Sequence, residues 1–157
     1  MIGSAIAAGF VATLLMTTIM RGASEVKLTR LDFALLLGTT VSDNRRVARA
    51  WGYVFHFVIG LGFAAAYVAF FHLVGRSGWV IGALLGALHA VFDGMVLVNI
   101  LLPLVHPRIA TPETAANEIA LVEPPGFLML NYGRSSFLVA LVAHMVYGAT
   151  IGLIARP

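Results

Sequence analysis

An almost unbroken apolar run from Trp79 to Val105 limits what this chain can fold into more than any other feature. It exceeds the about 20 residues that a helix needs to cross the hydrocarbon core of a bilayer. Near its middle lie His89 and Asp93, which are four residues apart and therefore share one face of a helix. Ionisable side chains are costly at this depth, so they face the protein interior and mark functional sites. We therefore expect a membrane protein organised around this helix.

The composition agrees with a membrane protein. Of the 157 residues, 60% are hydrophobic and 11% are charged, whereas a soluble domain has about 25% charged residues. The length suits one domain, so we expect residues 1–157 to form a single transmembrane domain. The absence of cysteine excludes disulfides, thiolate metal sites and cysteine nucleophiles. The net charge of +3 indicates basic loops at a membrane surface and no nucleic-acid partner.

Hydropathy predicts an all-α integral membrane protein with four spans, at about 1–20, 51–74, 79–105 and 135–155. Two further apolar segments are too short to cross: Leu31–Thr40 is expected to form an interfacial or re-entrant helix, and Phe127–Leu130 is expected at the interface. The predicted fold is a four-helix transmembrane bundle with one or two short interfacial helices on the cytoplasmic side.

Local signals add detail to this fold. Asp43 is a suitable N-cap for a second long helix that starts near Asn44, and Thr114–Leu121 is expected to form a short surface helix. The pattern His56-x-x-x-Gly60 of the second span recurs as His144-x-x-x-Gly148 in the fourth. This suggests a repeat of span, short helix and span in one orientation, although short apolar helices also resemble one another by chance.

The basic residues predict the orientation. Eight of the ten lie in the connections after the first and third spans: Arg21, Lys27, Arg30, Arg45, Arg46, Arg49, Arg108 and Arg134. The positive-inside rule then puts both long connections in the cytoplasm and both termini outside.

A histidine shares a face with small residues in three of the four spans. The three sets are Gly52, His56 and Gly60; Gly82, Gly86, His89 and Asp93; and His144, Gly148 and Gly152. Small residues mark the faces through which membrane helices touch. Flanking arginines put Asp93 and His144 at similar depth, so we expect these two side chains to meet, with His56 and His89 within a turn or two.

Three roles are open for the cluster of His56, His89, Asp93 and His144. Imidazoles with a carboxylate suit a transition metal, and histidines on two helices can also hold haem. The cluster could instead relay protons, because histidine titrates near neutral pH. The third role is structural, with polar side chains bonded between helices. The spacings match no recognised ligand motif.

A second candidate site lies on the predicted cytoplasmic face. It combines His106, Arg108, Glu123, Asn131, Tyr132 and Arg134, in connections stiffened by prolines. Its arginines could hold a lipid phosphate. The alternative is that they anchor helix ends and pair with Glu123.

Four segments resemble a family of small, uncharacterised bacterial four-span membrane proteins. They are LDFALLLGT, the His-Pro-Arg at His106–Arg108, EPPGFLMLNYGR at Glu123–Arg134, and AHMVYGATIG at Ala143–Gly152. The resemblance covers most of the chain from Leu31 onward. It implies a bacterial inner membrane protein with four spans, and it implies no activity.

Three functions follow from these observations. The first is an accessory or scaffold subunit of a membrane assembly, which needs other membrane chains or further copies as partners besides the lipid bilayer. The second is a metal- or haem-binding membrane protein that uses the intramembrane histidines and Asp93. The third is an oligomeric transporter or membrane enzyme. The sequence carries no signature of an enzyme and does not identify a cofactor.

Overall fold

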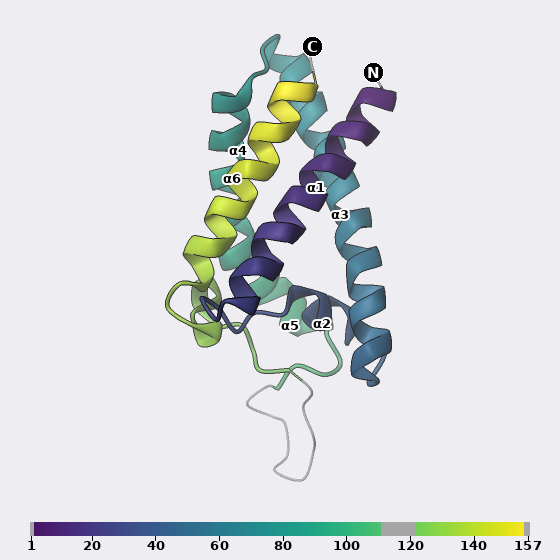
Figure 1. Cartoon of the computed structure of the whole chain (residues 1–157), viewed down its shortest axis with the longest axis vertical. Coiled ribbons are helices and arrows are strands. Elements are labelled where there is room, and N and C mark those ends of the chain that lie inside the picture. Colours follow the sequence, from purple (N-terminus) through teal and green to yellow (C-terminus); the bar gives the residue numbers. More distant parts are fainter. Residues whose placement is uncertain (1, 111–121, 156–157) are drawn as a thin grey trace.

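The computed structural model describes residues 2–110 and 122–155 as an all-α bundle (Figure 1). Four helical segments in this part of the chain are long and apolar enough to cross a membrane. They are α1 (Ile2–Glu25), α3 (Arg45–Val74), a third span made of α4 (Trp79–Phe92), η1 (Asp93–Leu101) and α5 (Leu102–Val105), and α6 (Ser136–Ile154). The predicted fold class is thereby confirmed.

The spans alternate in direction, and the short helices lie between them at one end. Helix α2 (Phe33–Gly38) follows α1, and the 3₁₀-helix η2 (Phe127–Tyr132) precedes α6. Both lie at the end opposite the chain termini (Figure 1), which we call the α2 end. The order of span, short helix and span thus occurs twice, as the suggested repeat requires; a common origin of the two halves stays a prediction.

Helices α4 and α6 pack along a seam of glycines. A methyl group added at Gly82 would collide with the carbonyl oxygen of Gly148, and one at Gly86 would collide with that of His144. Gly152 similarly packs on the backbone of Gly78. The seam brings two backbones into contact, as small residues do in membrane helix pairs.

Helix α3 packs on α1 and α2 by the same means. A side chain at Gly60 would meet Thr13 of α1, and one at Gly52 would meet the carbonyl group of Ala34 in α2. The predicted small-residue faces therefore all point into the bundle.

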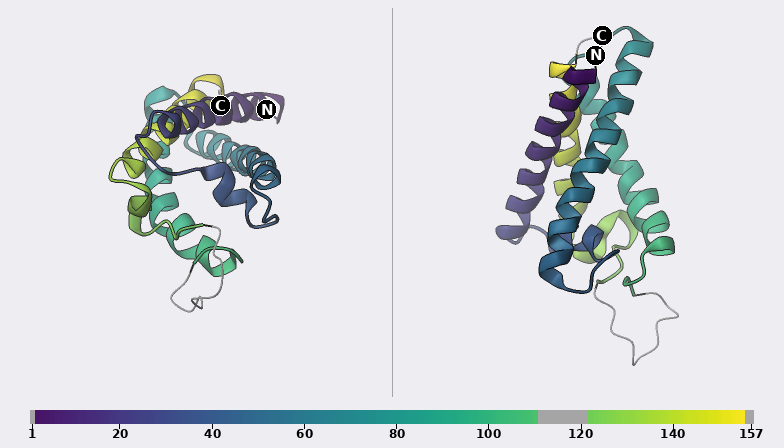
Figure 2. Two further views of the ribbon diagram at one scale, coloured as in Figure 1. Left: turned by 60° about the horizontal axis from the view of Figure 1, so that its bottom comes forward. Right: turned by 90° about the vertical axis from the view of Figure 1, so that its right-hand side faces the viewer.

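The third span and α3 are held apart. Helix α6 packs against α4 and α1, and α1 packs against α3, but the backbones of α3 and α4 hardly meet. Seen obliquely from the α2 end, the helices follow a curve whose two ends are α3 and the third span (Figure 2). Where these two approach, they touch through aromatic side chains, with the rings of Phe63 and His89 4.0 Å apart.

The start of α3 corrects one prediction. Asn44, and not Asp43, is its N-cap, because the Asn44 side chain accepts hydrogen bonds from the backbone N–H groups of Arg46 and Val47. Helix α1 also continues past the predicted span to Glu25. Thr114–Leu121, predicted as a surface helix, lies outside the described residues.

The middle of the third span is a π-helix. Segment η1 spans 9 residues from Asp93, and its end is marked by a bond from the Leu102 N–H to the Leu97 carbonyl, five residues earlier. Pro103 follows directly and has no N–H to donate to the carbonyl of Asn99, which weakens the α-helical pattern here. Wide turns of this kind are rare and concentrate at functional sites.

Candidate functional site

A largely apolar cavity of about 630 Å³ lies between α3 and the third span. Its back is formed by Thr13 and Met16 of α1 and by Tyr147 of α6. Helices α2 and η2 close it at the α2 end through residues such as Leu36 and Met129. Towards the gap between α3 and the third span, its lining becomes exposed. The exposed lining residues are Ile59 (45%), Leu101 (46%), Leu104 (76%) and Val105 (76%).

All four residues of the predicted intramembrane cluster line this cavity: His56, His89, Asp93 and His144. They come from three different spans. His144 is near the middle of α6, His89 lies in the last turn of α4, and Asp93 begins η1. The small-residue faces explain why these side chains come together. Each histidine lies three or four residues from a glycine that packs against a neighbouring helix, so the histidine points to the same side of its helix as that contact.

Asp93 and His144 form the predicted contact. The His144 Nε2 atom lies 3.8 Å from Asp93 Oδ2, and His144 is 3% exposed. The Nδ1 atom of His144 is 2.7 Å from the Ala140 carbonyl oxygen, which can only accept, so Nδ1 carries a proton. Nε2 therefore faces the Asp93 carboxyl group, at a separation longer than a hydrogen bond. The two side chains are neighbours between α6 and the start of η1.

His89 is enclosed by aromatic rings. Its Nδ1 atom is 3.3 Å from the Tyr67 hydroxyl, and its ring centre is 4.0 Å from that of Phe63. The rings of His89 and His144 meet edge to face at 4.8 Å. His89 thus bridges α3, α4 and α6.

His56 and Thr13 carry buried polar atoms without a partner. Neither His56 Nε2 nor Thr13 Oγ1 has a hydrogen bond within the described part of the protein, and both atoms are inaccessible to solvent. The His56 ring packs on Phe33 of α2, with ring centres 4.5 Å apart. A buried polar group without a hydrogen bond is destabilising by about 1–3 kcal/mol, so these two atoms need an explanation.

The cluster does not form a ready metal centre. Within residues 2–110 and 122–155, no group of three or more His, Asp or Glu side chains is close enough to hold one ion. Metal or haem binding by His56, His89, Asp93 and His144 therefore stays a prediction.

At the α2 end, His106 and Arg108 of the second predicted site connect α2 to the end of the third span. His106 Nδ1 accepts from the Arg108 backbone N–H at 3.1 Å, so Nε2 carries the proton and donates to the Leu36 carbonyl at 2.9 Å. The Arg108 guanidinium donates to the carbonyl oxygens of Thr39 (2.7 Å) and Thr40 (3.3 Å), which directly follow α2. Burial lowers the pKa of His106, and the nearby Arg108 charge lowers it further.

Glu123, Asn131 and Tyr132 form a separate group around Arg30. Arg30 pairs with Glu123 at 3.3 Å, and its guanidinium also donates to the Asn131 carbonyl. The Tyr132 hydroxyl donates to the Glu123 carbonyl oxygen at 2.5 Å, and its backbone carbonyl accepts from the Arg30 N–H at 2.8 Å. Burial raises the pKa of Tyr132 to about 12, and the Glu123 charge contributes.

The six predicted residues of the second site thus do not converge on one ligand position. His106 and Arg108 bind the backbone of α2 and its C-cap, whereas Glu123 and Tyr132 bind each other and Arg30. Asn131 accepts from Arg30 and donates to the Pro124 carbonyl. Arg134 is exposed and joins neither group. These contacts match the alternative in which the arginines anchor helix ends.

Sequence reasoning missed Thr13, Phe63 and Tyr67. Phe63 and Tyr67 share the His56–Gly60 face of α3 at spacings of three and four residues, which could have indicated them. Thr13 has no such signal, because threonine is common in α1.

Comparisons with family models, curated proteins and solved structures found no match to this chain. The findings support a small four-span integral membrane protein, and they identify no family or activity.

Proposed function

We propose that this protein binds a lipid-like molecule in the cavity between α3 and the third span. The observation that carries the proposal is the apolar cavity of about 630 Å³, with His56, His89, Asp93 and His144 in its wall. Its volume falls within the range of about 300–1,000 Å³ that small-molecule sites occupy. An apolar wall with a few polar groups is also the usual composition of such sites.

The position of the opening supports a ligand that arrives from the bilayer. Exposed lining residues such as Ile59 and Leu101 belong to predicted spans, so they would face lipid. At the α2 end the cavity is lined by η2 and by α2, and His106 and Arg108 hold α2 in place. A water-soluble ligand would therefore have to pass these helices, whereas a lipid would enter from the side.

The two other functional roles considered for the intramembrane cluster, metal binding and proton relay, agree less well with the structure. A metal site requires several ligands around one ion, and the described residues contain no such group. A proton relay would need a water-accessible route, and the cavity wall around the His144–Asp93 pair is apolar. We propose that the pair and His89 hold the cavity wall together.

A pair of tryptophan substitutions in the third span tests the proposal. Leu97 lines the cavity, and Leu88 is 68% exposed and lies outside it. In Leu97→Trp the indole should fill part of the cavity and reduce labelling by a photoactivatable lipid analogue several-fold, whereas Leu88→Trp should label like the wild type. Equal labelling of Leu97→Trp and the wild type would refute the proposal.

An accessory subunit of a membrane assembly is the second candidate. In its most apolar stretch, 11% of the third span's residues are buried, against 28% to 44% in the other spans. A helix from another subunit, or from a second copy, could cover this span. Native mass spectrometry distinguishes the two candidate functions. Lipid binding predicts a lipid bound to a single chain, whereas an accessory subunit predicts a stoichiometric protein partner.

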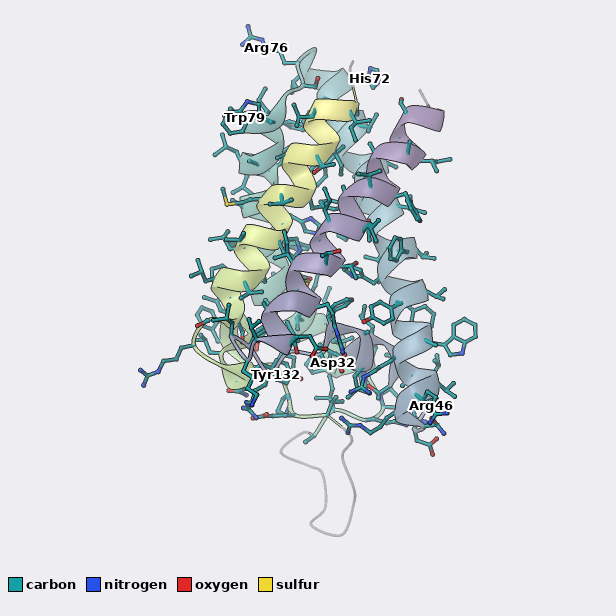
Figure 3. The ribbon with its side chains drawn as sticks, in the orientation of Figure 1. Asp32, Arg46, His72, Arg76, Trp79 and Tyr132 are labelled. Carbon is teal, nitrogen blue, oxygen red and sulfur yellow. The ribbon has the colours of Figure 1, made fainter. Side chains whose placement is uncertain are left out.

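We also propose that both termini face outward from a bacterial inner membrane. The support is that the arginines of α3's first turn, such as Arg46, lie at the α2 end, whereas Arg76 lies at the other end (Figure 3).

A further inference from the structure

We infer that the bound lipid has a polar group that donates a hydrogen bond, a hydroxyl or an ammonium, and that this group binds the carboxyl group of Asp93. The inference rests on the proposed lipid binding and adds the chemical class of the ligand. Its basis is that Asp93 lines the cavity with an accessible carboxyl group that has no hydrogen-bond partner among the described residues.

The Asp93 carboxyl group lacks a partner where it needs one. Its one polar contact within residues 2–110 and 122–155 is with His144 Nε2 at 3.8 Å, which is longer than a hydrogen bond. A carboxyl group in apolar surroundings is costly unless it is hydrogen-bonded. Asp93 is also the first residue of the π-helix η1, a rare form that concentrates at functional sites. We therefore expect the partner of Asp93 to come from the cavity.

The Asp93 side chain is open to such a partner. It is 24% exposed, whereas the His144 side chain beside it is 3% exposed. The unpaired polar atoms of Thr13 and His56 are inaccessible to solvent, so a ligand does not bond to them. Asp93 is therefore a polar group of the cavity wall that a ligand can reach.

The chemistry of a carboxyl group determines which ligand group fits. A carboxylate only accepts hydrogen bonds, and a protonated carboxyl group keeps oxygen lone pairs that accept. A ligand that donates therefore suits Asp93 in both states, whereas a ligand that only accepts suits the protonated state alone. A hydroxyl and an ammonium both donate, and an ammonium adds the attraction between opposite charges.

The charges around the cavity argue against an anionic head group. No Arg or Lys belongs to the cavity lining in the described part of the chain, and phosphate and carboxylate groups are normally bound by such cations. An anion beside an ionised Asp93 would also be repelled. Fatty acids and anionic phospholipids are therefore the wrong class of ligand.

The test measures competition against a fatty alcohol with a photoactivatable diazirine beside its hydroxyl, using the full chain in detergent. At about pH 9, carboxylic acids are ionised and alkylamines are protonated. The competitors share one alkyl chain: hexadecanol, hexadecylamine, hexadecyl methyl ether, hexadecane and palmitate. We expect hexadecanol or hexadecylamine to compete about three- to tenfold better than the ether, which only accepts, because one hydrogen bond has about this effect. The better of the two identifies the donor as a hydroxyl or an ammonium.

Two variants connect this preference to Asp93. In Asp93→Leu the acceptor is gone, so hexadecanol and hexadecylamine should lose their advantage over the ether. Hexadecane should displace the probe from Asp93→Leu at least as well as from the wild type, which shows that the cavity is intact. The matched control is Asn99→Leu, which removes a polar side chain of η1 that does not line the cavity, so it should keep the wild-type order of competitors.

The labelled positions give a second measurement that needs no variant. Because the diazirine lies beside the hydroxyl, mass spectrometry should find the label on Asp93 or on the cavity residues nearest to it in the chain, His89 and Leu97. If these three residues stay unlabelled while other lining residues are labelled, the inference is wrong, whether or not Asp93→Leu folds.

The outcomes distinguish this inference from the function on which it rests. If the ether or hexadecane competes as well as both donors, if palmitate competes best, or if Asp93→Leu keeps the wild-type order, the inference about Asp93 is wrong while lipid binding stands. If no competitor displaces the fatty alcohol, lipid binding itself is wrong.

Discussion

Individual glycines set the distance between α4 and α6. At Gly82, Gly86 and Gly148, the space that a side chain would need is filled by backbone of the other helix. The seam also fixes His144, because the Gly86 backbone lies against the His144 carbonyl group. A single residue in this seam therefore controls both helix packing and the position of the cavity wall.

The substitution Gly86→Val should destabilise the protein by about 1–3 kcal/mol or more, because the new side chain forces the two backbones apart. Thermal unfolding in detergent would measure the change. The matched control is Gly62→Val on α3, where an added methyl group meets nothing within 4 Å. Equal stability of the two variants would contradict the packing described for α4 and α6.

A second residue-scale prediction concerns the start of α3. Asn44→Ala should lower the free energy of unfolding by about 1 kcal/mol, because two N–H groups lose their acceptor. Asp43→Ala should change it by less than about 0.5 kcal/mol, as surface substitutions usually do. Chemical unfolding of both variants would check this, and a larger effect at Asp43 would reinstate it as the cap.

At this scale, helical spacing predicted much of the candidate site. The shared faces of His56, His89 and His144 with glycines correctly placed all three in the bundle interior. The N-cap was missed because Asp43 and Asn44 are adjacent and have equal capping preference. Only the backbone path decides which of two such neighbours faces the first helical turn.

Among the elements, α2 depends most on side-chain bonds. It has only 6 residues, too few to be stable alone. Asp32 caps its start and also accepts from Arg49 Nε of α3 at 2.8 Å, while His106 and Arg108 hold its end. The element that closes the cavity is thus fixed at both ends by residues of other elements.

The bond from His106 predicts a pH dependence. Folding lowers the pKa of His106 below its usual value, so below about pH 6.5 the unfolded chain binds a proton that the folded protein does not. The stability that this contributes is complete above about pH 6.5 and declines as the pH falls. Thermal unfolding at pH 7.5 and 5.5 should show a smaller decline for His106→Gln, which cannot titrate.

The other histidines are the same in the wild type and in His106→Gln, so the difference between the two proteins isolates His106. An identical decline in the wild type and in His106→Gln would show that His106 is not protected from protonation in the folded protein.

The sequence predicted the existence of α2 but not its surroundings. Its length excluded a span, and Gly38 correctly marked its end. Its end is bonded to His106 and Arg108, which are about 70 residues away in the chain and which no periodic pattern connects to it. The π-helix η1 was also missed, because an apolar run has the same composition in either helical form.

For the whole molecule, the arrangement of the spans could not be predicted. Four spans and a common end for the termini follow from counting apolar runs. The separation of α3 from the third span does not, because lipid-facing and cavity-facing positions are equally apolar. The cavity therefore became visible only in three dimensions.

The proposed orientation can be measured directly, because the chain contains no cysteine. Ser77→Cys lies in the connection between α3 and α4, and Val41→Cys lies at the α2 end, where Val41 is 53% exposed. In intact cells, a thiol reagent that cannot cross membranes should label Ser77→Cys, and it should label Val41→Cys only after permeabilisation. The reverse result would invert the orientation.

Because of the π-helix, the number of residues in the third span determines the direction in which the residues after it point. Segment η1 takes more residues per turn than an α-helix does. Removing one residue from it would rotate everything that follows by about 100°. His106 and Arg108 would then point away from the end of α2, although every side chain that makes the bonds would still be present. Within η1, the number of residues matters to the closure of the cavity as much as their identity does.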